Sequence, residues 1–258
     1  MLTLKNKLFA LALLFFISFT FTACDDDDDN PEPVESVVFF EFEHYIDGNP
    51  VTFNQIMYTN EFGNEYSVET LKYFISEIRL MHSDGTEYLV DTAFYVDGTD
   101  EATMMTSQGV LIPNGDYESI SFIFGLSKEM NTPGRFPNAP ESNMEWPPAM
   151  GTGYHYMKLE GKIDSAGTIN NFQAHTGPTM NNQNFINVTM PESSFSANGN
   201  AMVLRIRMNI NQWWENPNTL DLNTVTGIMG NQDMQLKLKA NGADVFTFSG
   251  VDFPLSTQ

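Results

Sequence analysis

Residues 37–45, VVFFEFEHY, contain the pattern that decides the fold. Apolar positions alternate with positions that are polar or face outward. The pattern therefore repeats every two residues, as side chains do along a β-strand. An extended chain therefore places every second residue of this run on one face. One of these residues is an imidazole that shares its face with three apolar side chains, so we expect it to point toward the core. The four residues on this face are Val38, Phe40, Phe42 and His44.

Similar short runs recur along the rest of the chain, separated by turn residues such as Ser83-Asp84-Gly85 and Asn198-Gly199-Asn200. No regular alternation of strands with long helices is visible, and no internal repeat. The pattern predicts an all-β fold, a single β-sandwich or barrel-like domain of many short antiparallel strands with a few short helices. The expected strands are the run from Val34 and residues 51–58, 73–81, 87–96, 117–124, 153–163, 170–175, 185–188, 201–210 and 245–248; the expected short helices are 67–71, 212–216 and 231–240.

Residues 127–152 interrupt this rhythm. Five prolines fall within these residues, at positions 133, 137, 140, 147 and 148, and they exclude a regular element over most of the segment. Loops of this length in compact domains are usually functional or disordered. The aromatic residues Phe136 and Trp146 favour an ordered loop.

The N-terminal residues 1–23 have the features of a targeting segment. Lys5 and Lys7 precede an apolar run, residues 8–21, that is too short to span a bilayer as a folded helix. Small residues then stand directly before Cys24, which is the only cysteine. The arrangement resembles a bacterial lipoprotein signal, in which the peptide is cut before the cysteine and the cysteine is lipid-modified. An ordinary secretory signal or an uncleaved anchor is the alternative.

Residues 24–35 are expected to form an acidic tether between the lipid anchor and the β domain, residues 36–258. The run Asp25–Asp29 and the prolines that follow it cannot pack a core. The run resembles the surface-export signal of Bacteroidetes-type lipoproteins, and a solvated spacer is the simpler interpretation. We therefore expect an outer membrane lipoprotein that is held by its lipid anchor and is either periplasmic or surface-exposed.

Charge and motif content limit the classes of function. The formal net charge is −21, and it becomes −23 once Lys5 and Lys7 are removed with the signal, so nucleic acid is excluded as a partner. Such a charge attracts cations weakly. The sequence contains no nucleophile elbow, no H-E-x-x-H motif, no P-loop and no dinucleotide-binding glycine pattern, which favours a binding protein over an enzyme.

Residues 144–178 contain the chemistry that points to a metal. Two of the four histidines, His155 and His175, lie here close to Trp146, Met150 and Met157. Imidazole nitrogen and thioether sulfur suit a transition metal, with copper as the leading candidate. With His44 from the first strand, tertiary pairing could bring three histidines together. Taken singly, each histidine is more often a hydrogen-bonded core or surface residue, and each methionine a core filler.

The order of motifs along the chain resembles the copper-binding MbnP family, a group encoded near methanobactin systems and widespread as lipoproteins in Bacteroidetes. The resemblance covers about residues 36–250, and its specificity comes from the order of the motifs. The segments that carry it are Phe42-Glu43-His44, Tyr66-Ser67-Val68, 71–80, Asp84-Gly85, 113–117, 122–125, Met144-Glu145-Trp146, 153–161 and Phe172-Gln173-Ala174-His175.

The resemblance implies an extracytoplasmic β-sandwich-like protein that binds one copper ion through histidines. It also implies a tryptophan near the metal that a dihaem peroxidase-type partner can oxidise to kynurenine. Carried over by motif, His44 and His175 match the family histidines, and Trp146 matches the first tryptophan of its M-x-W segment. The chain departs from the family pattern where Pro147 and Pro148 replace a second tryptophan, and His155 is additional.

A different class of function remains open from the residues alone. A metal-free surface β-sandwich could bind a glycan or a protein partner. The adjacent Trp213 and Trp214, which we expect to pack with one ring partly exposed, would then form the binding face together with the loop 127–152. Convergence of the three histidines within a few Å would distinguish the copper site from this alternative, because nitrogen–metal bonds are about 2 Å long.

Overall fold

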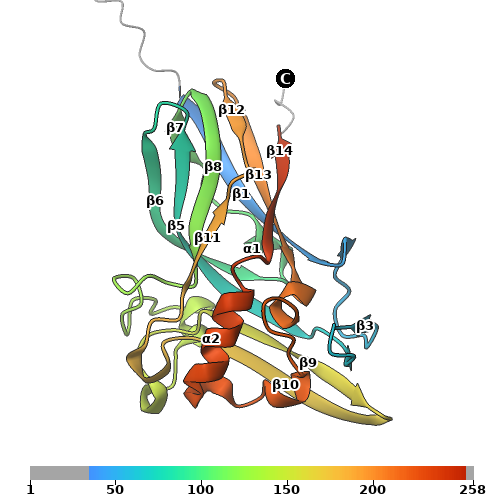
Figure 1. Cartoon of the computed structure of the whole chain (residues 1–258). Helices are drawn as coiled ribbons and strands as arrows, with labels where there is room; N and C mark the ends of the chain where they lie inside the picture. The colour runs from blue at the N-terminus through green and yellow to red at the C-terminus, as the bar shows by residue number, and fades with distance from the viewer. Residues whose placement is uncertain (1–34, 254–258) are drawn as a thin grey trace, which may run out of the picture. The chain divides into compact units, whose positions relative to one another are not determined.

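The computed structural model describes residues 35–253, which form two β-sheets (Figure 1). The smaller sheet has the strand order β14-β13-β1-β2, with β7 also paired to β1. Within it β1 and β13 run parallel, from Val37 opposite Ala201 to Tyr45 opposite Asn209, while the other pairs are antiparallel. The strands are β1 (Glu35–Ile46), β2 (Asn49–Pro50), β7 (Val110–Pro113), β13 (Ala201–Asn209) and β14 (Phe246–Asp252).

The larger sheet has nine strands in the order β11-β8-β5-β9-β4-β3, with β6 paired to β5, β10 to β9 and β12 to β8. All of its pairs are antiparallel. The predicted all-β, sandwich-like domain is therefore confirmed, with the β1–β13 pair as a parallel exception. The strands are β3 (Tyr58–Thr59), β4 (Glu65–Tyr66), β5 (Thr70–His82), β6 (Glu87–Asp97), β8 (Gly115–Phe124), β9 (Met157–Ser165), β10 (Thr168–Thr176), β11 (Ile186–Met190) and β12 (Phe195–Ala197).

Strand β5 changes its neighbour on one edge partway along its length. Residues 70–73 pair with β9, whereas residues 75–82 pair with β8. The change occurs at Phe74, whose N–H donates to the Tyr156 carbonyl and whose carbonyl accepts from the Gly125 N–H. The end of β8 and the start of β9 therefore meet at this point, and the chain that joins them, residues 125–156, must return to the same place.

Helices are few and short in the described residues. Helix α2 (Gln232–Asn241) begins after Asn231, whose side chain accepts from the Met234 N–H, an N-cap that satisfies one free donor of the first turn. None of the helices in residues 35–253 is both long and apolar enough to cross a membrane. The other helices are α1 (Glu101–Met104) and the 3₁₀ turns η1 (Glu141–Met144), η2 (Pro148–Met150), η3 (Thr179–Asn181), η4 (Ile210–Trp214), η5 (Leu222–Thr224) and η6 (Ile228–Gly230).

Two of the expected elements are wrong. Residues 67–71 are not helical, because Ser67 and Glu69 donate their backbone N–H groups to carbonyls of β9, and sheet pairing overrides the local preference. Residues 51–58 are largely irregular: Asn54 has a left-handed backbone (φ 66°), which interrupts an extended run. The loop 127–152 is irregular as expected, apart from η1 and η2.

The core lies between the two sheets, and the alternating residues of β1 enter it as predicted. The exposed fractions of Trp213 and Trp214 are both 0%, so the expectation of a partly exposed ring is wrong, and these two rings cannot form a stacking platform. A second cluster of buried residues fills the space beneath the loop 127–152, which confirms that this loop is ordered by packing. Its members are Phe74, Leu126, Met130, Met144, Tyr154 and Tyr156.

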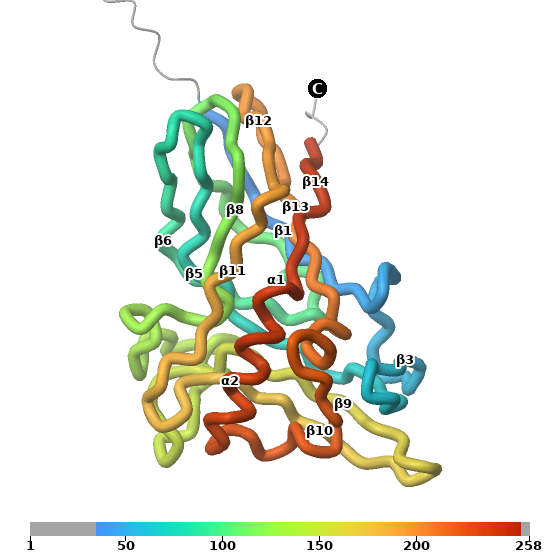
Figure 2. Tube along the Cα trace, viewed as in Figure 1, coloured from blue at the N-terminus to red at the C-terminus, as the bar shows by residue number. Residues whose placement is uncertain are grey.

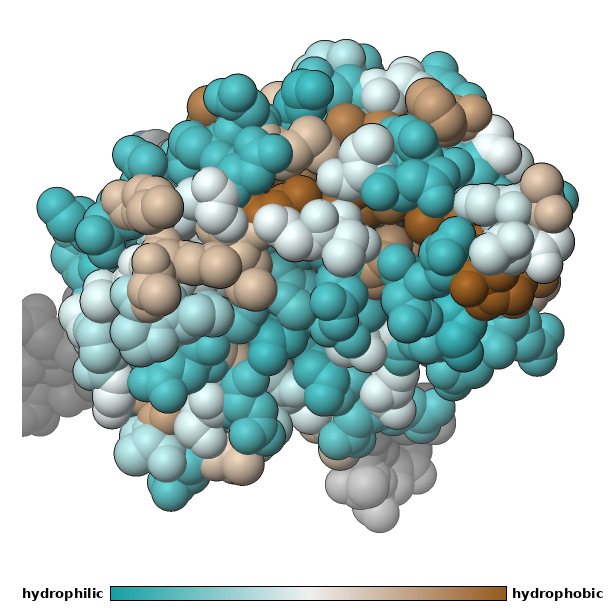
Figure 3. All heavy atoms as spheres, turned by 90° about the horizontal axis from the view of Figure 1, so that it is seen from below, coloured by the Kyte–Doolittle hydropathy of each residue, from teal (hydrophilic) through white to brown (hydrophobic). Residues whose placement is uncertain are grey.

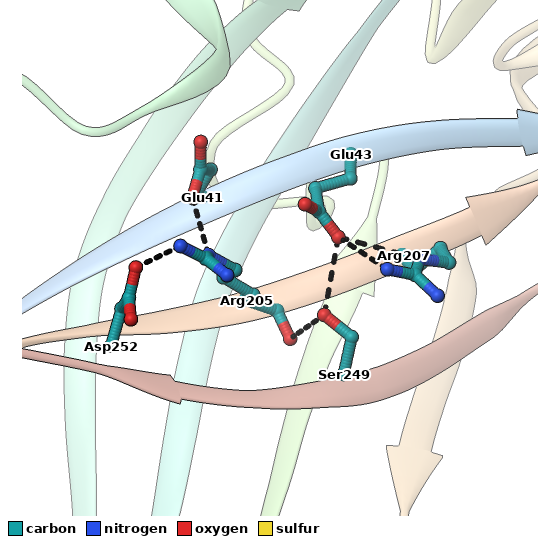
Figure 4. Close-up of polar contacts among 6 residues, drawn as sticks. All are labelled: Glu41, Glu43, Arg205, Arg207, Ser249 and Asp252. Atoms are coloured by element: carbon teal, nitrogen blue, oxygen red, sulfur yellow. Dashed lines mark hydrogen bonds and ion pairs between the residues drawn. The ribbon is translucent and has the colours of Figure 1, made fainter. Parts of the chain in front are cut away.

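The outer face of the small sheet carries cross-strand ion pairs (Figure 4). Arg205 Nε lies 3.1 Å from Glu41 Oε2, and Nη2 of the same side chain pairs with Asp252 on β14. Arg207 Nη2 lies 3.1 Å from Glu43 Oε2. The parallel register sets these pairs, because it places residue 41 opposite 205 and residue 43 opposite 207. Partly exposed pairs of this kind contribute about 0–1 kcal/mol each. Their contribution to the stability of the fold is therefore small, and their main effect is to favour this register.

The predicted signal peptide, the lipidated Cys24 and nearly all of the acidic tether lie outside the described residues.

Candidate functional site

Two of the predicted histidines lie side by side where β5 changes its neighbour. The ring centroids of His155 and His175 are 5.1 Å apart, and the rings are nearly perpendicular, with an interplanar angle of 85°. The Trp146 ring also packs against His155, with its centroid 4.7 Å from that of His155. Trp146 and His155 are buried, and His175 is partly buried.

Backbone hydrogen bonds bring these three residues together from separate segments. The Trp146 N–H donates to the Gly153 carbonyl (2.7 Å), and the His155 N–H donates to the Met144 carbonyl (2.6 Å), so the two ends of residues 144–155 pair as in a short ladder. The next residue, Tyr156, donates its N–H to the carbonyl of Thr176 at the end of β10 (2.8 Å). Strand β9 therefore begins at Met157, and His155 precedes it instead of lying within the expected strand 153–163.

His155 is held in one tautomer and in the neutral form. Its Nδ1 lies 2.9 Å from the carbonyl oxygen of Met144, which can only accept, so Nδ1 carries the proton and Nε2 keeps its lone pair. Burial lowers the pKa of His155 to about 3, and the nearby charge of Lys158 acts in the same direction. The imidazole is therefore neutral at physiological pH and available as a metal ligand.

His175 is oriented by a carboxylate. Its Nε2 lies 2.7 Å from Oε1 of Glu160, a residue of β9. The hydrogen bond from His175 to Glu160 lowers the pKa of the carboxyl group. In neutral His175 the Nε2–H donates to this carboxylate, which leaves the Nδ1 lone pair free. Metal-binding histidines commonly donate their second N–H to a carbonyl or a carboxylate, as both histidines do here.

The Trp146 ring fits a space that only glycine leaves open. A Cβ added to Gly177 would lie 2.4 Å from two carbon atoms of the ring, and a Cβ added to Gly151 would lie 3.3 Å from the indole and 2.2 Å from the Pro178 carbonyl oxygen. The indole Nε1 is buried and has no hydrogen-bond partner. Packing therefore fixes the ring against His155 without a polar contact at its nitrogen.

His44 lies elsewhere, on the inner face of β1. Its Nε2 is 2.9 Å from the hydroxyl oxygen of Tyr73, its Nδ1 has no partner, and burial lowers its pKa to about 4. It lines a cavity of about 530 Å³ together with Phe53 and Gly98. In residues 35–253 no three or more His, Cys, Asp or Glu side chains are grouped so that they could hold a metal ion. The structure therefore brings together the pair His155 and His175, but not the predicted set of three histidines.

The residues that orient the pair had weaker signals in the sequence. The turn at residues 165–168 and the alternation on both sides of it predict a hairpin that places Glu160 and His175 on the same outward face, so this contact was open to sequence reasoning. The Met144 contact is made by a backbone carbonyl and has no residue signature.

The surface seen in Figure 3 is mostly hydrophilic, and its hydrophobic side chains are interrupted by polar ones.

The donor set fits a transition metal that accepts imidazole. Both imidazoles keep a free lone pair, and each proton-bearing nitrogen is held by an oxygen atom. The fold and the site together define an all-β, two-sheet protein with an oriented histidine pair beside a buried tryptophan. The chain belongs to the MbnP family, whose model matches residues 35–247.

A solved structure, MbnP from Methylosinus trichosporium, supports the same fold. The TM-score is 0.51 at 14% sequence identity, and the match covers 74% of this chain and 82% of that one. No curated protein matches the sequence. At this identity the likeness bears on the fold alone, so the function rests on family membership and on the geometry of the site.

Proposed function

We propose that the protein binds one copper ion through His155 and His175, with Trp146 beside the metal, and that it captures or hands over copper at the cell envelope without acting as an enzyme. One observation carries the proposal: the two imidazole rings lie 5.1 Å apart, and each has its proton-bearing nitrogen held by an acceptor. When bound, the metal would be held by the two remaining ring nitrogens. His44 is left out because it lies in the other sheet and contacts Tyr73.

Copper suits this donor set better than zinc does. Among divalent first-row metals, copper has the highest affinity for nitrogen sites. Structural zinc sites take four protein ligands, and catalytic zinc sites take three. The described residues offer two histidines here and no larger group of typical ligands.

The rest of the chain supports a role at the cell envelope. The formal net charge of −21 favours the approach of cations. We propose that Cys24 is lipidated and holds the domain at the outer membrane, on its periplasmic or its outer face. Labelling with a radioactive fatty acid should mark the parent chain and leave a Cys24→Ser variant unmarked.

Copper binding can be tested with the metal-free protein. Titration with Cu(II), and with Cu(I) under reducing conditions in the presence of a competing chelator, should reveal one site. His155→Ala and His175→Ala should each weaken binding by at least tenfold. His82→Ala is the matched control, because His82 lies at a turn beside Asp84, and His44→Ala should also keep the affinity. Unchanged binding in the double variant of His155 and His175 would contradict the proposal.

We further propose that Trp146 is the residue on which a dihaem peroxidase-type partner acts. The support is its contact with His155 and its match to the family's M-x-W segment. Intact-mass analysis of protein produced together with such a peroxidase should show oxidation in the parent and none in Trp146→Phe. Identical masses for the parent with and without the peroxidase would exclude this partner.

A further inference from the structure

A side chain of helix α2 completes the hydrogen bonding of the strand that carries His175. Strand β10 pairs with β9 on one edge only. On its other edge, Gln235 Nε2 donates to the His175 carbonyl (2.8 Å), and Gln235 Oε1 accepts from the Gly177 N–H (3.1 Å). Figure 2 shows α2 lying against this part of the chain. The side-chain amide thus replaces one residue of a missing neighbouring strand, since it bonds the carbonyl of one residue and the N–H two residues further on.

The contact is buried and fully bonded. The exposed fraction of Gln235 is 1%, and its Nε2 also donates to the Ile228 carbonyl (3.2 Å). The carbonyl of Gly177 accepts from Asn184 Nδ2 (2.8 Å). Side-chain amides therefore hold the backbone on both sides of Thr176, directly after the proposed ligand. Breaking a buried hydrogen bond of this kind costs free energy, because it leaves a buried polar group without a partner. The bond therefore restrains the backbone strongly.

We propose that Gln235 is a positioning residue that sets the place of His175 relative to His155 and thereby the affinity of the metal site. This inference rests on the proposed function. The two histidines come from separate segments, so their relative position depends on what holds each backbone. Gly177 also contacts the Trp146 ring, so a shift of residues 175–177 would move both sides of the site. Nitrogen–metal bonds vary by only about 0.2 Å, so a small displacement suffices to weaken binding.

The test compares two buried amides on the same helix. Gln235→Met keeps the approximate shape and removes the three side-chain bonds. Asn241→Leu is the matched control: Asn241 is equally buried and donates to the Trp213 and Asn218 carbonyls, but none of its hydrogen bonds reaches the site. Among folded proteins, Gln235→Met should bind copper about 10–100-fold more weakly and change the Cu(II) electron paramagnetic resonance spectrum. Asn241→Leu should lose stability and keep both the affinity and the spectrum.

A measurement without metal separates this inference from the proposed function. The imidazole ¹⁵N chemical shifts of His175 in the metal-free protein should change in Gln235→Met and stay as in the parent in Asn241→Leu. If the parent binds no copper but the shifts change, the proposed function fails while Gln235 still positions His175. Parental imidazole shifts in folded Gln235→Met, or parental copper affinity and spectrum in that variant, would overturn the positioning role.

Discussion

Acid should destabilise the protein through buried histidines, and His44 allows the effect to be measured. Burial lowers the pKa of His44 to about 4 from the ordinary value of 6.5, and the charge of Asp97 offsets only part of this effect. Below pH 6.5 the His44 imidazole therefore binds a proton in the unfolded chain but not in the folded protein, so the free energy of unfolding falls as the pH falls. The loss continues until the pH reaches the folded pKa. For one such group it amounts to about 2 kcal/mol between pH 7 and pH 5.

The variant that isolates this effect is His44→Gln. A glutamine side chain offers both a carbonyl and an N–H group to the Tyr73 hydroxyl, which lies 2.9 Å from Nε2 in the parent, but it does not titrate in this range. Urea unfolding at half-unit steps from pH 8 to pH 4.5 gives the free energy of unfolding of both proteins. We expect parallel curves above pH 7 and a change of about 2 kcal/mol in favour of the variant between pH 7 and pH 5.

His155 adds a second loss of the same sign, since burial lowers its pKa to about 3. A double variant of both histidines to Gln should therefore be flatter still between pH 7 and pH 5. Curves that stay parallel between the parent and His44→Gln over this range would refute the reasoning, because they would mean that His44 takes up its proton equally in the folded and unfolded states.

Two further substitutions probe the packing and the charge of the site. Gly177→Ala places a methyl group within 2.4 Å of the Trp146 ring and should cost about 1–3 kcal/mol in thermal or urea unfolding. Gly230→Ala is its control, with no atom within 4 Å of the added carbon; equal stability of the two variants would contradict the close packing. Glu160→Gln keeps an acceptor for His175 but removes the charge, and should weaken copper binding about tenfold or more in a chelator competition titration. An affinity equal to that of the parent would show that the carboxylate charge does not tune this ligand.

Strand β1 could be predicted from the sequence because its period-two pattern is local. A period of two with one apolar face predicts both the extended backbone and the burial of β1, and both are observed. The parallel partner of β1 could not be read, since β13 lies more than 160 positions further along the chain and periodicity does not record pairing. The helix predicted over residues 67–71 is wrong for a related reason, because Ser67 and Glu69 bond to β9, far along the chain. The strand predicted over residues 51–58 is wrong for a local reason, the left-handed backbone of Asn54.

The chemistry of the site could be predicted from the sequence, but only some of the residues that form it could. The sequence indicates His155, His175 and Trp146 because imidazole and aromatic side chains gather in one segment, and the structure places them in contact. The strand position and the motif of His44 also indicate a ligand, but His44 lies in the opposite sheet, a relation that the sequence does not express. Gln235 was missed because a buried glutamine bonded to backbone has no motif.

The position of the site follows from the way β5 is shared. Since β8 leaves β5 and β9 joins it at Phe74, the connection between these strands must pass over the junction, and its length gives room for a loop with its own aromatic cluster. The two histidines and the tryptophan belong to this loop and to the end of β10, while most of the core lies between the sheets. Most of the core contacts therefore lie away from the contacts that orient the ligands. Substitutions in the loop can therefore change the donor set while the two sheets stay intact.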